Sequence, residues 1–311
     1  MSGRGEHRPL RVLVAGRDGQ LARALVPAFA GAGWRVSALG RADGLDLAGS
    51  PSAIVAAVRS VSPDLVVNAA AYTAVDRAES EPDAALAVNR DGAGALAAAA
   101  HATGAPVLHV STDYVFDGDK GAPYTETDRP TPIGAYGRSK LEGERAVLAA
   151  NPRSAVVRTS WVVSATGQNF LRTMLRLAET RDEVSVVNDQ RGAPTFASDL
   201  AAAALRMAPR LLRSPAGDEA FGVFHLSGAP DTTWHGFAAA VFAGAASRGQ
   251  KVPKLNAIPT SAYPTPTRRP ADSRLDCSRI LAVHCIARPD WRPSLERCLG
   301  QLLHAEASVP A

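Results

Sequence analysis

The sequence predicts a protein of the α/β class, with a doubly wound parallel sheet and a smaller C-terminal lobe. Short apolar runs alternate with helical segments through the first half of the chain, and a glycine-containing turn follows the first apolar run. Beyond Ser160-Trp161 the alternation loosens and proline-rich loops become common. Repeated strand–helix–strand units build parallel sheets with right-handed crossovers. We therefore predict a Rossmann-type domain over residues 10–160 and a mainly substrate-binding lobe over residues 161–304, with some segments of the lobe returning to the first domain.

Composition and charge narrow the class of partner. The chain has 311 residues, of which 46% are hydrophobic and 21% are charged, and these values are ordinary for a globular enzyme. The net charge of +4 comes from scattered arginines, without a basic block that interleaves with aromatic residues, so we expect no nucleic-acid partner. The excess positive charge would help to attract an anionic substrate.

Cysteine usage and the chain start indicate the compartment. Cys277, Cys285 and Cys298 have neither an even count nor metal-ligand spacing, which fits a reducing environment. Residues 1–9 are short and polar and lack the apolar core of a signal peptide. No apolar run reaches membrane-spanning length. The sequence therefore predicts a soluble cytoplasmic protein with no membrane partner.

Residues 11–15 form the first predicted strand, and a helix through Ala30 follows. Between them, Gly16 permits a tight turn and Gly19 lets backbone N–H groups approach a pyrophosphate at the helix N-terminus. Ala22 stands where a third glycine is usual. Strand, glycine turn and helix are the context of a dinucleotide-binding site, although such a turn alone also occurs without a cofactor.

The second predicted strand, residues 35–39, ends at Gly40 and Arg41. NAD enzymes commonly place a carboxylate here for the ribose 2′-hydroxyl, whereas an arginine suits a 2′-phosphate. Arg41 therefore favours NADPH, with NADH as the other possibility, unless Arg41 is simply a solvated loop cation. Asp46 and Leu47 follow where they could meet the adenine.

The middle of the domain continues the alternation, with a helix expected at residues 51–60. The third strand, within residues 63–71, ends in small residues that would let a ligand approach the backbone. A long alanine-rich helix is expected over residues 82–103, on which Asn89 is predicted to bond buried backbone groups rather than to act in catalysis. The fourth and fifth strands are predicted at residues 107–110 and 155–159.

A hydroxyl pair, Ser111-Thr112, follows the fourth strand at the edge of the sheet where ligands bind in this fold class. Further on, Tyr136 and Lys140 are spaced i, i+4 at the start of a predicted helix, so their side chains share one face. A nearby ammonium lowers the pKa of a phenol from its ordinary value of about 10, which would ease proton transfer near neutrality. We predict that Tyr136 is a general acid; the alternative is a solvated helix face.

The segment between Phe116 and Tyr136 is long and rich in glycine, proline, threonine and aspartate. Such a loop in a compact domain is usually functional, so we expect it to cover the substrate. In the second half, short strands are expected at residues 184–187 and 223–226.

Together these motifs resemble the extended short-chain dehydrogenase/reductases and, more narrowly, the dTDP-4-dehydrorhamnose reductase family. The resemblance extends over nearly all of residues 10–300. The motifs that carry it are Gly-x-x-Gly-Gln-Leu at 16–21 and the segments 67–79, 111–118, 136–140, 158–162, 169–170, 188–195 and 262–275.

The resemblance implies reduction of the C4 ketone of dTDP-4-dehydro-L-rhamnose (dTDP-4-dehydro-6-deoxy-L-mannose) to dTDP-L-rhamnose, by hydride transfer from NADPH. Tyr136 would be the proton donor, Lys140 its cationic partner and Thr112 a ligand of the keto group. The residues implied at the cofactor are Gly16, Gly19, Gln20, Leu21, Arg41, Asp46, Leu47, Ala70, Ala71, Tyr72, Tyr136 and Lys140. The residues implied at the substrate are Thr112, Asp113, Trp161, Asn169, Arg269 and Arg274. Arg269 and Arg274 would hold the diphosphate, or would instead brace the fold, and Trp161 could be a core indole.

Two departures from the family pattern bear on ligands. Gly40 stands where some members carry an acidic ribose ligand, which favours NADPH. Some members bridge two subunits with Mg²⁺ through carboxylates, but here the first acid after Pro194-Thr195 is Asp199, so Mg²⁺ is doubtful and we expect no metal. We expect a monomer or a weak homodimer.

Three other functions share parts of this pattern. A related dTDP-4-keto-6-deoxysugar reductase of a secondary-metabolite pathway, for example one that makes dihydrostreptose, would share the same catalytic residues. A non-catalytic regulatory subunit on this fold would usually lack part of the tyrosine–lysine pair, which is intact here. An epimerase or dehydratase is less favoured, since Asp113-Tyr114 offers a single carboxylate.

Overall fold

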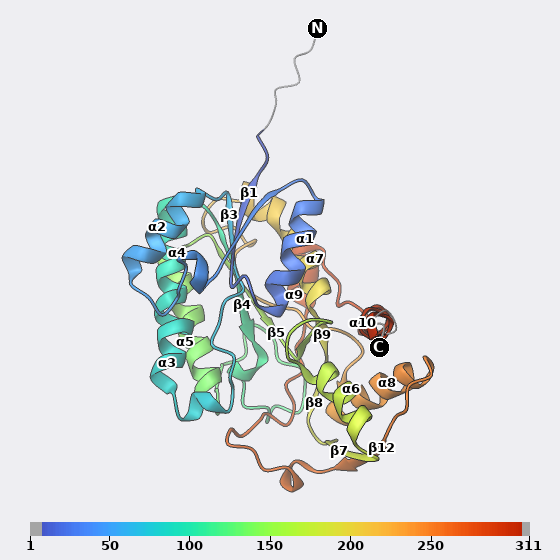
Figure 1. Cartoon of the computed structure of the whole chain (residues 1–311). Helices are drawn as coiled ribbons and strands as arrows, with labels where there is room; N and C mark the ends of the chain where they lie inside the picture. The colour runs from blue at the N-terminus through green and yellow to red at the C-terminus, as the bar shows by residue number, and fades with distance from the viewer. Residues whose placement is uncertain (1–7, 307–311) are drawn as a thin grey trace.

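The computed structural model describes residues 8–306, and its centre is one sheet of parallel strands (Figure 1). The strand order is β10-β5-β4-β3-β1-β2 in a 6-stranded sheet. The strands are β1 (Arg11–Ala15), β2 (Arg35–Leu39), β3 (Leu65–Asn68), β4 (Val107–Thr112), β5 (Ser154–Thr159) and β10 (Gly222–His225). The predicted α/β class with a parallel sheet is therefore confirmed. The segment considered for a signal peptide lies almost entirely in residues 1–7, outside the described residues.

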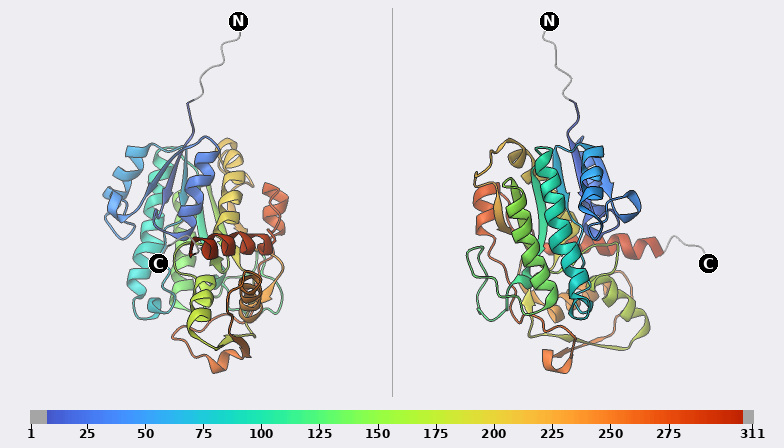
Figure 2. Two further views of the ribbon diagram at one scale, coloured as in Figure 1. Left: turned by 45° about the vertical axis from the view of Figure 1, so that its right-hand side comes forward. Right: turned by 90° about the vertical axis from the view of Figure 1, so that its left-hand side faces the viewer.

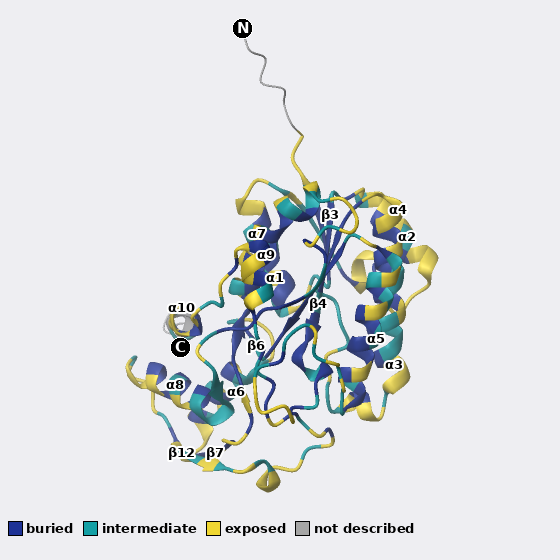
Figure 3. Ribbon diagram, turned by 180° about the vertical axis from the view of Figure 1, so that it is seen from behind, coloured by how far each residue is buried: buried dark blue, intermediate teal, exposed yellow. Residues whose placement is uncertain are grey.

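Helices cover both faces of the sheet because its strands are apolar on both sides. Val12 and Val14 pack on one side with α1 (Gln20–Gly31) and α7 (Ala197–Arg213), whereas Leu13 and Ala15 pack on the other. Successive strand residues point to opposite faces, so a continuous apolar run suits a sheet buried between two layers. The second layer contains α2 (Pro51–Val61), α4 (Ala93–Ala102) and α5 (Ala135–Ala150), and α9 (Ser278–His284) belongs to the first. Figure 3 shows the buried sheet between more exposed helices.

The helix expected over residues 82–103 is interrupted. It consists of α3 (Pro82–Leu86), a π-helical segment η3 (Ala87–Gly92) and α4. Within η3, Asn89 accepts a hydrogen bond from the Tyr72 backbone N–H at 2.9 Å and donates to the Tyr72 carbonyl at 3.1 Å. The predicted backbone-bonding role of Asn89 is confirmed. Single π turns are frequent near functional sites, and this one holds the loop after β3.

The second half forms a smaller layer below the sheet, seen also in the side views of Figure 2. Its apolar core gathers residues of α6 (Phe170–Thr180), α8 (Trp234–Ala246) and α10 (Trp291–Glu306). Short strand pairs complete it: β7 (Glu183–Val187) with β12 (Lys254–Ile258), β6 (Val162–Val163) with β9 (Thr195–Phe196), and β8 (Arg191–Gly192) with β11 (Thr232–Thr233). The remaining turns are η1 (Arg41–Asp43), η2 (Arg77–Glu79), η4 (Asp113–Val115) and η5 (Thr260–Ala262).

Segments of the second half also return to the sheet. The strand expected at residues 223–226 is β10, which pairs in parallel with β5, and α7 packs against α1. Along the described chain, no helix is long and apolar enough to span a bilayer.

Candidate active site

The carboxyl ends of β1 and β3 meet where the strand order reverses, and this is the place where open parallel sheets bind ligands. Gly16, directly after β1, has a φ of +95°, which a residue with a side chain rarely adopts. A Cβ at Gly16 would lie 2.8 Å from Cα of Ala70. The first turn and the loop after β3 therefore fit closely together only because Gly16 lacks a side chain.

The N-terminus of α1 is open to an anion. Gly19 is the N-cap, no side chain caps this helix, and its first turn carries no acid. The N–H groups at the start of a helix need acceptors, and phosphate is a favoured one. The side chain of Gln20 points to the second half instead, where its Oε1 accepts hydrogen bonds from Asn169 Nδ2 at 2.7 Å and from Ser164 Oγ at 3.1 Å.

Two arginines flank the end of β2. Arg41 is exposed in η1. Arg17, which the sequence analysis missed, is in the glycine turn and pairs with Asp43 at 2.5 Å. The Asp43 carboxylate also accepts the backbone N–H of Gly40 at 2.9 Å. The position of Arg17 between the two glycines of the turn was the feature of the sequence from which its pairing with Asp43 could have been expected. Beyond η1, Asp46 accepts the Ala48 backbone N–H at 3.0 Å, and Leu47 is buried.

Thr112, Asp113 and Tyr136 meet at the carboxyl end of β4. The Thr112 hydroxyl donates to Asp113 Oδ1 at 3.1 Å. Burial raises the pKa of Asp113 to about 6, although hydrogen bonds with Ser273 and Thr112 act against this rise. Asp113 Oδ2 is buried without a hydrogen-bond partner among the described residues. Burial also raises the pKa of the Tyr136 phenol, and its hydrogen bond with Thr112 opposes the rise.

The position of Tyr136 depends on close packing of α5 against η4. A Cβ at Gly137 would lie 2.1 Å from the Tyr114 carbonyl oxygen, so the glycine lets the helix backbone touch that residue. The rings of Tyr114 and Tyr136 meet edge to face, with centroids 5.9 Å apart. On the other side, Tyr136 and Tyr72 pack against one small apolar cluster. The hydroxyl of Tyr72 donates to Glu81 Oε2 at 2.7 Å.

Lys140 is only 2% exposed, and its Nζ donates to the Val110 carbonyl at 2.7 Å. Nζ also lies 3.5 Å from His109 Nε2. Burial lowers the pKa of Lys140 to about 8, while the charge of Glu144 acts in the opposite direction. The i, i+4 spacing led to the expectation that Lys140 lowers the pKa of Tyr136. That expectation is wrong here, because loss of solvation dominates at the phenol and its pKa is raised.

The predicted substrate residues of the second half have protein partners. The Trp161 ring stacks on Trp234 at a centroid distance of 3.7 Å, and Trp161 has a φ of +45°. Asn169 caps α6, accepting the Arg172 backbone N–H at 3.1 Å. Arg269 pairs with Asp76 at 3.1 Å. The Trp234 contact could not be predicted from the sequence, because the two tryptophans are far apart in the chain.

Arg274 is held more tightly than Arg269. Its guanidinium donates to both carboxylate oxygens of Asp272, at 2.8 and 2.6 Å. The neighbouring backbone fixes the long loop after Phe116, since Tyr124 N donates to the Arg274 carbonyl and Asp276 N donates to the Tyr124 carbonyl, each at 2.8 Å. The loop over residues 117–135 is thus tied to the C-terminal part of the chain.

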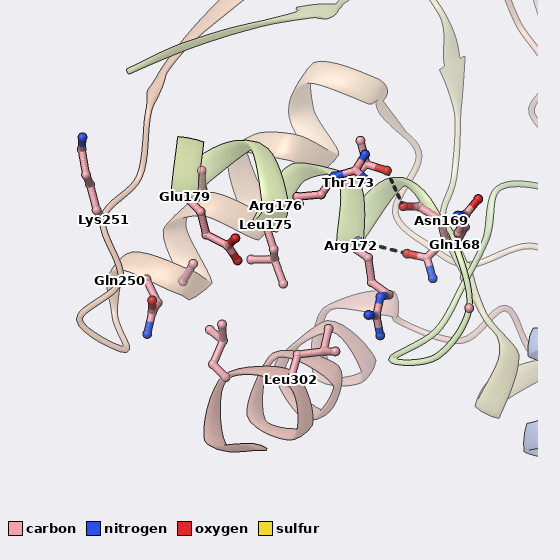
Figure 4. Close-up of a pocket in the computed structure, with 14 residues that line it drawn as sticks. Gln168, Asn169, Arg172, Thr173, Leu175, Arg176, Glu179, Gln250, Lys251 and Leu302 are labelled. Atoms are coloured by element: carbon pink, nitrogen blue, oxygen red, sulfur yellow. Dashed lines mark hydrogen bonds between the residues drawn. The ribbon is translucent and has the colours of Figure 1, made fainter. Parts of the chain in front are cut away.

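A cavity of about 650 Å³ lies apart from Tyr136, between α6, α8 and α10 (Figure 4). Asn169 is the one predicted site residue in its lining. No group of three or more histidine, cysteine or acidic residues that could hold a metal occurs within residues 8–306.

Comparisons with known proteins agree over the whole fold. The family model described as the RmlD substrate binding domain matches residues 10–304. A dTDP-4-dehydrorhamnose reductase from Sinorhizobium fredii is 49% identical over 294 residues, which are 94% of this chain and 98% of that relative. The crystal structure of a dTDP-4-dehydrorhamnose reductase from Clostridium acetobutylicum has a TM-score of 0.87 at 35% identity, covering 94% of this chain and 100% of that chain. The Bacillus anthracis enzyme, solved in complex with NADP, has a TM-score of 0.86 at 32% identity, covering 94% of this chain and 99% of that chain.

Similarity that extends over so much of both chains, at this level of identity, goes beyond a shared fold. The chain belongs to the dTDP-4-dehydrorhamnose reductase family.

Proposed function

We propose that the protein reduces the C4 ketone of dTDP-4-dehydro-L-rhamnose to dTDP-L-rhamnose with NADPH, and that Tyr136 is the proton donor. The observation that carries this proposal is the meeting of the Thr112 and Tyr136 hydroxyls at the carboxyl end of β4. The neighbouring switch point, with its uncapped helix α1, suits a dinucleotide. The proposed substrate is inferred from the relatives, which are named as dTDP-4-dehydrorhamnose reductases.

The chain offers a fitting site for the cofactor. The open N-terminus of α1 would receive the pyrophosphate, and Arg41 would meet a 2′-phosphate, as a guanidinium fork matches phosphate geometry. Bound NADPH would supply the hydride that the ketone accepts at C4. The residues proposed to line the cofactor are Gly16, Gly19, Gln20, Leu21, Arg41, Asp46, Leu47, Ala70, Ala71, Tyr72, Tyr136 and Lys140.

The protein's own part in the reaction is to bind the ketone and to deliver one proton to its oxygen. Because burial raises the pKa of Tyr136, the phenol keeps its proton at neutral pH and is available as an acid. The Thr112 hydroxyl, which donates to Asp113 in the free protein, would turn to donate to the same oxygen. The alkoxide that forms at O4 takes the phenol proton, so a neutral hydroxyl results and a phenolate remains at Tyr136.

Other residues are proposed to hold the sugar and its nucleotide. Asp113 has a buried carboxylate oxygen without a partner among the described residues, which fits a sugar hydroxyl as donor. Arg269 has one carboxylate partner, whereas Arg274 is held by both oxygens of Asp272, so Arg269 is the better diphosphate ligand. Trp161 would lie against the sugar. Asn169 would contribute to the site by holding the side chain of Gln20 through its hydrogen bond.

The test is NADPH oxidation with dTDP-4-dehydro-L-rhamnose, comparing the wild type with Tyr136→Phe and with the control Tyr263→Phe. Tyr263 is 57% exposed, so its change should leave turnover intact. We expect turnover in the wild type and control and a loss of about 100-fold or more in Tyr136→Phe. Folded wild-type protein that turns over another 4-keto-6-deoxysugar nucleotide, but not this one, would instead favour the secondary-metabolite reductase.

A further inference from the structure

Three buried polar side chains lie in contact with one another. One comes from β3, one from β4 and one from α5, the helix that carries the proposed proton donor. Asn68 Nδ2 lies 3.0 Å from Nδ1 of His109, and His109 Nε2 lies 3.5 Å from Nζ of Lys140. The exposed fractions of these side chains are 1%, 0% and 2%. Buried polar groups are hydrogen-bonded to their neighbours, so the partners of each nitrogen indicate whether that nitrogen carries a proton.

The orientation of the Asn68 amide is fixed by the backbone. Its Oδ1 accepts the N–H of Ala70 at 3.1 Å. The opposite orientation would point the amide NH₂ at that N–H, which places donor against donor. Nδ2 therefore faces His109 and donates to it.

The donor on Asn68 sets the tautomer of His109. Nδ1 accepts from Asn68, so it carries no proton. Burial holds the pKa of His109 well below its ordinary value, and the charge of Lys140 lowers it further, so the ring is neutral. A neutral imidazole carries one proton, which must then be on Nε2. The N–H that results is directed at Lys140.

An imidazole N–H next to Nζ favours the amine form of Lys140 over the ammonium form. The amine has a lone pair that can accept this N–H, and it still donates to the Val110 carbonyl at 2.7 Å. The ammonium has three donors and no acceptor, so it would face another donor across 3.5 Å. Glu144 on the same helix favours the ammonium, but the two carboxylate oxygens of Glu144 are held by Arg158 from β5. Tyr136, one turn earlier, is the remaining titratable group on this face of α5.

We propose that His109, oriented by Asn68, is a positioning residue that shifts the protonation equilibrium of Lys140 towards its neutral amine. The inference rests on the proposed function of Tyr136. Because Lys140 is one turn of α5 after Tyr136, the charge at this turn of the helix then depends on the tautomer of His109.

The first experiment measures the tautomer without any turnover, by long-range ¹H–¹⁵N correlation spectra of ¹⁵N-histidine-labelled protein. His109→Gln identifies the resonances of His109, and His101→Gln, a change at an exposed histidine, is the matched control. We expect the proton on Nε2 in the wild type. In Asn68→Asp the new carboxylate accepts from the ring, so the proton should move to Nδ1. A proton on Nδ1 in the wild type would overturn the proposal.

The second experiment follows the ¹³Cε resonance of Lys140 through a pH titration, with Lys140→Arg for its assignment. A midpoint of about 8 is expected in the wild type. In Asn68→Ala the ring is free to turn its lone pair to the ammonium, and we expect the midpoint to rise by about one pH unit. An unchanged midpoint in both Asn68→Ala and His109→Gln, with the fold intact, would contradict the role of His109.

The kinetic readout is the pH dependence of kcat/KM. If turnover needs the ammonium form of Lys140, the basic limb of this pH dependence should move to higher pH in Asn68→Ala by the same amount as the NMR midpoint. A merely structural role would lower kcat/KM at every pH and leave the limb in place. Failure of the wild type to turn over the proposed substrate would refute the proposed function, while the two NMR experiments would still decide the tautomer and the lysine equilibrium.

Discussion

Arg158 and Glu144 form a two-pronged ion pair inside the protein, between β5 and α5. Arg158 Nε donates to Glu144 Oε1 at 2.9 Å and Nη2 donates to Oε2 at 2.7 Å. Their side chains are only 4% and 3% exposed. The hydroxyl of Ser111 donates to the same carboxylate, which links the pair to the strand that carries Thr112.

We predict that Glu144→Ala lowers the free energy of unfolding by about 3–5 kcal/mol, because it leaves the Arg158 charge buried without a partner. Urea unfolding followed by circular dichroism measures this. Glu142→Ala is the matched control, since Glu142 pairs with Arg145 at the surface, where the side chains are 42% and 62% exposed. Its effect should be within about 0–1 kcal/mol. Equal losses in the two variants would show that burial of the pair does not matter.

Replacing Gly137 should displace α5, the helix that carries the proposed proton donor. In Gly137→Ala the new Cβ would lie 2.1 Å from the Tyr114 carbonyl oxygen, so α5 must move away from η4 and carry Tyr136 with it. We expect kcat to fall by about 100-fold, as small misplacements of a reacting group have effects of this size. Gly31→Ala is the control, because a Cβ there meets no atom within 4 Å. Full activity in folded Gly137→Ala would mean that Tyr136 does not need this contact.

Asp113 should make stability depend on pH. Its pKa is raised from 3.8 to about 6 in the folded protein, so between these values the folded state binds more protons than the unfolded state. Stability therefore falls as pH rises through this range, and the loss is complete above the folded pKa.

Asp113→Asn removes that titration. We expect the variant to be more stable than the wild type at pH 7 by about 1–3 kcal/mol, and the advantage should disappear near pH 4. Urea unfolding at both pH values tests this. The same variant should raise the KM for the sugar nucleotide if Asp113 accepts a sugar hydroxyl. A stability difference that is the same at both pH values would refute the titration of Asp113.

Arg41 should decide between the two nicotinamide cofactors. In Arg41→Ala we expect the Kd for NADPH to rise about tenfold, the size of one lost charge-assisted hydrogen bond, while the Kd for NADH stays nearly constant. Fluorescence titration of both cofactors measures this. Arg59→Ala, at an exposed arginine of α2, is the control. Equal rises for NADH and NADPH would contradict recognition of the 2′-phosphate by Arg41.

The strands and turns of the first half were predictable because their signals are local. A run such as Val12–Val14 is apolar on both faces, and Gly16 and Gly19 mark the turn directly in the sequence. The π segment around Asn89 was not predictable, since alanine-rich neighbours give a helical pattern whatever the hydrogen-bond spacing. The assignment of β10 to the main sheet depends on pairing with β5, which lies far away in the chain.

Contacts between distant residues explain the other misses. Nothing around His109 or Asn68 in the sequence announces that they meet Lys140, because three elements must come together first. The effect of burial on Tyr136 could not be seen for the same reason: spacing indicates which residues are neighbours on a helix but not how much water reaches them. The predicted monomer or weak homodimer and the predicted cytoplasmic location stay predictions.

The pairing of Tyr124 with the segment around Leu275 has a consequence for biosynthesis. During translation the N-terminal sheet can begin to fold once its own strands have left the ribosome. The loop after Phe116, however, makes its backbone–backbone hydrogen bonds to other segments with residues 272–276, which emerge much later. These contacts of the loop can therefore form only after residues 272–276 have been synthesised, so a nascent chain can have folded N-terminal strands before this loop is held in place.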